Sequence, residues 1–191
     1  MRIVALLLAA SVALSACTSQ FEPIAPSTGY SQIGATVKSP NEPGWALGYA
    51  RPNGIALGKQ LANGASTIIL TNVSQVAGSS SNEQFFDKVL AIRRQDNNPA
   101  RFAITSDKNT PVSFKNAACI ETKFTALDRK ASATAPHYLK NTGYICRHPA
   151  NNDVAILMEL SVRSAEKTLS QANLAVAHAF FADVTFTNDG L

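Results

Sequence analysis

The sequence lacks a concentrated charge of either sign. Charged residues make up only 16% of the 191 positions, and no run of basic residues is longer than two. The small basic excess, 17 Lys and Arg against 13 Asp and Glu, is spread along the chain. A nucleic-acid groove needs a concentrated basic face with stacking aromatic side chains. We therefore expect no nucleic-acid partner, and the composition favours one globular domain.

Motifs for catalysis and metal binding are also missing. The chain has no Gly-x-Ser-x-Gly elbow, no phosphate-cradling glycine loop, no His-Glu-x-x-His and no Cys-x-x-Cys. None of His137, His148 and His178 lies at ligand spacing from a second histidine or a carboxylate. Glu121 and Glu159 lie on predicted strands, where we expect solvated outward charges. The sequence favours a non-enzymatic domain without cofactor or metal, although a triad assembled in space leaves no sequence motif.

One uncharged apolar run, Ile3 to Leu14, follows the single basic residue Arg2. It is too short to cross a hydrocarbon core of ~30 Å and has the length of a signal-peptide core. The run ends in Leu14-Ser15-Ala16-Cys17, which resembles the lipobox of bacterial lipoprotein precursors. An ordinary secretory signal with Cys17 as a bystander is the alternative, and it fits the four residues less well.

The resemblance implies a signal peptide over 1–16 and a lipid anchor on Cys17. The thiol would receive diacylglycerol, and the amine freed by cleavage would receive a further acyl chain such as palmitate. One acyl chain binds a bilayer marginally, whereas two or more hold a protein stably. Thr18 stands where inner-membrane lipoproteins commonly carry Asp, so the resemblance implies an outer-membrane anchor and a domain facing the periplasm.

The segment 17–43 is predicted to be the lipidated N-terminus and a flexible linker. It carries Pro23, Pro26, Pro40 and Pro43 among small polar residues, with no sustained period of two or 3.6. The folded domain is expected to span 44–191. The alternative for the linker is that its isolated apolar residues dock on this domain or on a partner; they are Phe21, Ile24, Tyr30, Ile33 and Val37.

Within that domain, local patterns predict strands, a helix, more strands and a second helix. Pro52-Asn53-Gly54 predicts a hairpin turn, and Ser81 with Gln84 resembles a capping box at the start of a helix over 82–97. A second amphipathic helix is predicted over 165–182. The predicted strands are 45–51, 55–61, 67–73, 102–105, 112–127, 144–146 and 153–163, and 184–186 either adds an edge strand or covers the core. These elements indicate an α+β fold, an antiparallel sheet packed with two helices, and their order is similar to the PsbP-like fold.

Cys119 and Cys146 remain once Cys17 is assigned to lipid. An even pair in an oxidising compartment predicts a disulfide. If Ile120 and Ile145 face the core, both cysteines face away from it together, as cross-strand neighbours could. Two buried free thiols or a redox pair are the alternatives, and the missing Cys-x-x-Cys spacing favours a structural disulfide.

Two functional hypotheses follow. The first is an accessory or protein-interaction module, anchored to the bilayer through Cys17 and binding another envelope protein. The second is a small-ligand-binding or hydrolytic domain, whose only support is a polar patch predicted around Tyr144, Arg147 and His148.

Overall fold

The computed structural model describes residues 22–95, 97–130 and 136–191. The predicted signal peptide, the lipobox and Cys17 lie outside these residues. None of the helices in the described part of the chain is long and apolar enough to cross a membrane.

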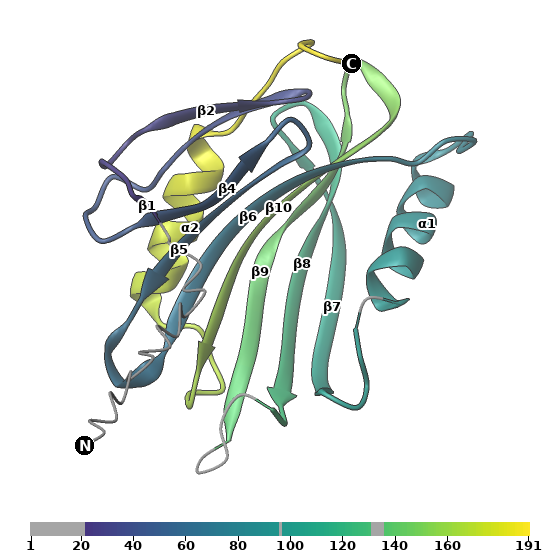
Figure 1. Ribbon diagram of the computed structural model, residues 1–191. Helices are drawn as coiled ribbons and strands as arrows, with labels where there is room; N and C mark the ends of the chain where they lie inside the picture. The colour runs from purple at the N-terminus through teal and green to yellow at the C-terminus, as the bar shows by residue number, and fades with distance from the viewer. Residues whose placement is uncertain (1–21, 96, 131–135) are drawn as a thin grey trace, which may run out of the picture.

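The described residues form two antiparallel sheets and two α-helices (Figure 1). The large sheet has eight strands in the order β1-β4-β5-β6-β10-β9-β8-β7, and the small sheet has the order β11-β3-β2. The bounds of the elements, in chain order, are β1 Glu22–Pro23, β2 Gly29–Gln32, β3 Ala35–Lys38, β4 Ala46–Arg51, β5 Gly54–Gln60, the 3-10 turn Ala62–Gly64, β6 Ser66–Gln75, α1 Asn82–Gln95, β7 Phe102–Phe114, β8 Ala117–Asp128, β9 His137–His148, β10 Asn151–Ser164, α2 Gln171–Asp183 and β11 Thr185–Phe186. The predicted α+β class, an antiparallel sheet with two helices, is confirmed, and strands dominate it.

Each helix lies on a different face of the large sheet. Ile156, Met158 and Leu160 of β10 point to the face that α2 and the small sheet cover, and they belong to the larger core. Ala155, one residue out of phase, belongs to a smaller core with Phe85 and Phe86 of α1. Figure 1 shows α1 standing apart from α2, beside β7. We call these surfaces the α2 face and the α1 face.

The predicted flexible linker is wrong for the residues that the structure describes. Residues 22–43 contain β1, β2 and β3, and the β2–β3 hairpin covers the core, with Ala35 and Val37 only 0% and 2% exposed. Pro26 and Pro40 lie outside the strands, where proline interrupts no ladder hydrogen bond. Strands of four residues, such as β2 and β3, are too short to show the alternation of polar and apolar residues in the sequence. The prediction of a flexible linker therefore relied on the prolines.

The prediction of a single strand over 112–127 is also wrong. The structure breaks it into β7 and β8 at Lys115 and Asn116, whose φ angles are 50° and 63°. Such a two-residue hairpin turn is normally marked by glycine, which is absent here. The turn reverses the alternation, so Phe114 packs on the α2 face whereas Ile120 packs against α1.

Helix α1 begins at Asn82, as predicted, and ends at Gln95 instead of 97. Ser81 Oγ accepts the backbone N–H of Gln84 at 3.2 Å, as predicted, but Gln84 Oε1 accepts the N–H of Ser80 instead of that of Ser81. Helix α2 begins at Gln171 instead of 165, after the N-cap Ser170, whose Oγ accepts the N–H of Asn173.

Candidate functional site

A groove of about 840 Å³ lies between α1 and the end of the β7–β8 hairpin. One wall is a single side of α1, the other wall is formed by residues around the hairpin turn, and apolar residues of both elements form the floor. The lining residues are Asn82, Glu83, Phe86, Asp87 and Leu90 of α1, with Pro111–Ser113 and Asn116–Ile120 of the hairpin. We call this the α1 groove.

The α1 groove combines an apolar floor with an acidic rim. Phe86, Leu90 and Ile120 belong to or pack against the smaller core and supply apolar surface. Glu83 and Asp87 are exposed, four residues apart on α1, and neither forms an ion pair with any residue that the structure describes. Like charges at this spacing destabilise a helix by about 0.2–0.5 kcal/mol, so a bound cation would relieve this repulsion.

Arg147 of β9 holds the beginning of α1 against the sheet. Its guanidinium donates to Ser79 O at 2.9 Å, to Asn82 Oδ1 at 3.0 Å and to Asn152 O at 2.7 Å. The same group lies over the ring of Phe85, 5.1 Å from its centroid. Arg147 is therefore a positioning residue for the helical wall of the α1 groove.

A buried ion pair holds the other end of α1. Arg93 Nη2 lies 2.8 Å from Glu159 Oε2 on β10, while Asn141 and Ser161 donate to Oε1, each at 2.9 Å. Glu159 is 7% exposed, so its predicted outward position is wrong, because α1 covers this part of the sheet. Burial raises the pKa of Glu159 above its usual range, against the lowering effects of Arg93, Ser161 and Asn141.

The predicted patch of Tyr144, Arg147 and His148 does not exist. Alternation along β9 places Tyr144 and His148 on the α2 face and Arg147 on the α1 face. Tyr144 stacks on Phe114 at 4.6 Å between ring centroids. His148 is 1% exposed, with Nε2 3.1 Å from Gly34 O and Nδ1 accepting the N–H of Ala150. Strand alternation was available from the sequence and separates Arg147 from its two neighbours in the patch.

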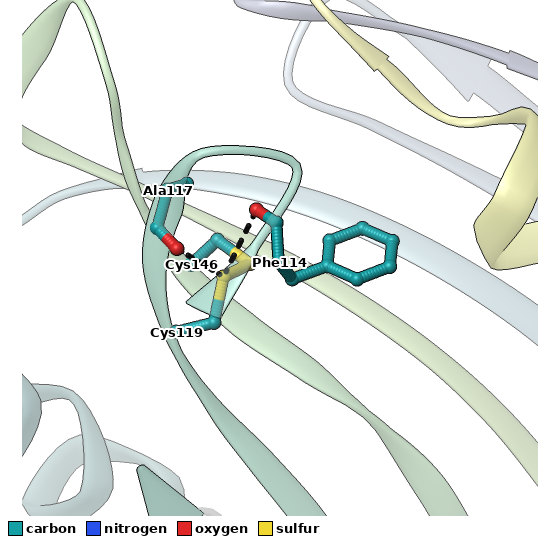
Figure 2. Close-up of a disulfide and its surroundings, with 4 residues drawn as sticks. All are labelled: Phe114, Ala117, Cys119 and Cys146. Atoms are coloured by element: carbon teal, nitrogen blue, oxygen red, sulfur yellow. Dashed lines mark hydrogen bonds between the residues drawn. A yellow bond between two sulfur atoms is a disulfide. The ribbon is translucent and has the colours of Figure 1, made fainter. Parts of the chain in front are cut away.

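Cys119 and Cys146 form a disulfide between directly opposite positions of β8 and β9 (Figure 2). Both are buried in the larger core, at 1% and 0% exposure, so the expectation that they face away from the core is wrong. Both faces of this sheet are covered, and alternation alone does not tell which one α2 packs against. Cys119 Sγ lies 3.6 Å from Ala117 O, beneath the β7–β8 turn that borders the α1 groove.

Sequence reasoning missed the carboxylates of the α1 groove. The spacing of Glu83, Phe86, Asp87 and Leu90 along one side of a predicted helix was the available signal. Their partner surface on the β7–β8 hairpin was hidden, because that hairpin was predicted as a single strand. Among the described residues, no three His, Cys, Asp or Glu side chains converge to hold a metal ion.

Comparison with known proteins assigns no family. No protein-family model matches the sequence, and no curated protein matches it. Among solved structures, the chain is similar to cyanobacterial PsbP (CyanoP) from Synechocystis sp. PCC 6803, with 12% sequence identity and a TM-score of 0.44. The match covers 86% of this chain and 94% of that chain. At this level of similarity the comparison has no bearing on function.

Proposed function

We propose that this protein is a lipid-anchored interaction module of the bacterial envelope. Its α1 groove would bind a segment of a partner protein that carries an apolar side chain next to a Lys or Arg. The observation that carries the proposal is the position of Glu83 and Asp87 beside the apolar floor, with no ion-pair partner among the described residues. The anchor on Cys17 and the outer-membrane, periplasm-facing location rest on the resemblance to the lipobox.

Charge complementarity selects the partner chemistry. An apolar side chain would fill the floor at Phe86, Leu90 and Ile120, and removing its surface from water contributes about 25 cal/mol per Å². A neighbouring Lys or Arg of the partner would contact the carboxylates of Glu83 and Asp87. This attraction between opposite charges also raises the association rate at low salt.

The free edge of β7 limits how the partner can bind. β7 is the last strand of the large sheet, so a peptide could add to it as a further strand. Pro111 lies in this strand and has no N–H to donate, and proline is a common device for blocking sheet edges. We therefore expect recognition through side chains in the α1 groove, with at most a short stretch of added strand.

Site-specific photocrosslinking in intact cells tests the groove. A crosslinker at Ser113, on the rim, should form an adduct with a protein whose crosslinked peptide contains a Lys or Arg beside apolar residues. Neutralising the rim with Glu83→Gln and Asp87→Asn should remove most of the adduct. Asp183→Asn, which changes an exposed carboxylate at the end of α2, should leave it intact.

A crosslinker at Ala175, exposed on α2, supplies the background signal. Equal adducts at Ala175 and Ser113, or an adduct that survives neutralisation of the rim, would reject the α1 groove as the binding site. The anchor is tested separately. Cys17→Ser should move the protein from the membrane fraction to the soluble fraction, and continued membrane association would reject lipidation.

A further inference from the structure

A second cavity, of about 280 Å³, lies on the α2 face between the sheet and the beginning of α2. Lysines reach it from three places: Lys123 on β8, Lys140 on β9 and Lys167 in the loop before α2. Three residues with hydroxyl groups also line the cavity: Thr125, Thr142 and Thr168. We call this the lysine cavity.

Lys140 is a buried cation that has no counter-ion among the residues of known position. It is 2% exposed, and no carboxylate of the described residues lies within ion-pair distance of its ammonium group. Its Nζ donates to Ser164 Oγ and to the backbone carbonyl of Glu166, which leaves one of three N–H donors without a described partner. Lysine is almost never fully buried unless it is paired, because an ammonium group loses its hydration on burial.

The surroundings add positive charge. Lys123 is paired with Glu121 at 2.9 Å, but Lys108 of β7 lies directly opposite it in the ladder. Like charges in directly opposite positions destabilise a sheet. Lys167 Nζ lies 5.5 Å from the centroid of the Tyr138 ring and has no ion pair with a described carboxylate. Burial lowers the pKa of Lys140, and among the described residues the charge of Glu166 opposes this lowering.

We infer that the lysine cavity is a binding site for a phosphate group. Lysine acts as a point charge toward phosphate, and hydroxyl groups supply further hydrogen bonds, whereas a planar carboxylate is better matched by arginine, which is absent from the lining. The volume is just below the usual range for small-molecule sites, so the cavity fits a small phosphate ester or a lipid headgroup. Leu169 and Leu174 border it and would contact the carbon atoms that carry the phosphate. This inference does not depend on the α1 groove.

Calorimetric titration of the purified lipidated protein in a non-ionic detergent tests the site. Inorganic phosphate and glycerol 3-phosphate should bind saturably at constant ionic strength. Lys167→Gln and Lys140→Met should each weaken binding about tenfold or more, because each removes a charge-assisted contact. Lys38→Gln, at an exposed position on β3, should bind like the unchanged protein.

Two further ligands distinguish the sources of phosphate. Tighter binding of dihexanoyl phosphatidic acid than of glycerol 3-phosphate would assign the site to a lipid, and equal or weaker binding would assign it to a soluble ester. Dihexanoyl glycerol, which lacks phosphate, should not bind. Absence of saturable phosphate binding, or binding unchanged in Lys167→Gln, would overturn the inference. Lys167 is not buried, so that result stands even if Lys140→Met fails to fold.

Discussion

Replacing Arg93 with methionine should loosen the C-terminal end of α1 and destabilise the protein in a pH-dependent way. Arg93 is the charged partner of Glu159, and the Arg93 and Glu159 side chains are 20% and 9% exposed. Removing one partner of a buried ion pair typically costs about 3–5 kcal/mol. Because Arg93 is partly exposed and Asn141 and Ser161 still donate to Glu159, we expect about 3 kcal/mol, at the lower end of that range.

The pH dependence follows from the raised pKa of Glu159. A carboxyl whose folded pKa is raised binds its proton more tightly in the folded state, so its effect on stability is most favourable below about pH 4.3, its unfolded pKa. Stability is then lost as the pH rises through the folded pKa. Arg93→Met removes the charge that lowers this pKa, so the loss should grow and extend to higher pH.

Urea unfolding of the unchanged protein, Arg93→Met, Glu159→Gln and the double variant, from about pH 4 to about pH 8, measures these effects. The penalty of Arg93→Met should be largest at the alkaline end. Adding Glu159→Gln should recover much of it there, with a coupling energy of about 1–3 kcal/mol. A penalty that does not change with pH, or a double variant as unstable as the sum of the single variants, would refute a buried charge pair at this position.

Three further predictions concern the sheet and its covalent link. Gly143→Ala would place a Cβ against the carbonyl oxygen of Met158 and should lower the free energy of unfolding, measured by thermal unfolding, by about 3 kcal/mol or more. In the control Gly29→Ala the new Cβ has nothing within 4 Å, so stability should change by less than about 0.5 kcal/mol. Equal effects of the two substitutions would contradict this prediction. Burial raises the pKa of Asp128, but hydrogen bonds from Arg101 and from a backbone N–H outweigh it, and the pKa lies below its usual range. Its stabilisation is therefore present above about pH 3.9 and lost as the pH falls through the folded value, so Asp128→Asn should flatten the acid limb of the stability profile, and an unchanged limb would argue against this role. Reducing the disulfide, whose cysteines are 27 residues apart in sequence, should lower the free energy of unfolding by ~3.5 kcal/mol. Urea unfolding with and without reductant measures this difference, and identical curves would show that the disulfide contributes no stability.

Local signals in the sequence were sufficient for much of the fold. The hairpin around Pro52-Asn53-Gly54 and the cap at Ser81 were predicted from a few adjacent residues, and both are present in the structure. The β7–β8 turn failed because Lys115 and Asn116 adopt positive φ without a glycine to mark them. Asparagine tolerates positive φ, but Lys115-Asn116 lacks the glycine that would have marked this turn in the sequence.

The candidate sites were beyond local patterns. The α1 groove joins residues 82–90 of a helix to residues 111–120 of a hairpin, and the lysine cavity joins two strands to a loop. The predicted patch failed because Tyr144, Arg147 and His148 are neighbours in sequence but alternate between two faces of one sheet. Residues that are adjacent along one strand point to opposite faces of the sheet. Side chains are brought together by the register between neighbouring strands.

The prediction of a lipid anchor rests on the sequence by itself, because the resemblance to the lipobox depends only on the order of Leu14-Ser15-Ala16-Cys17. The sequence also determined the pairing of Cys119 with Cys146, since only two cysteines remain beyond the lipobox. Only the tertiary structure decided that Glu159 is buried against Arg93 and that Lys140 is buried with no described carboxylate at ion-pair distance. Burial and charge pairing depend on which elements cover each face of the sheet, and that is set by packing across the whole chain.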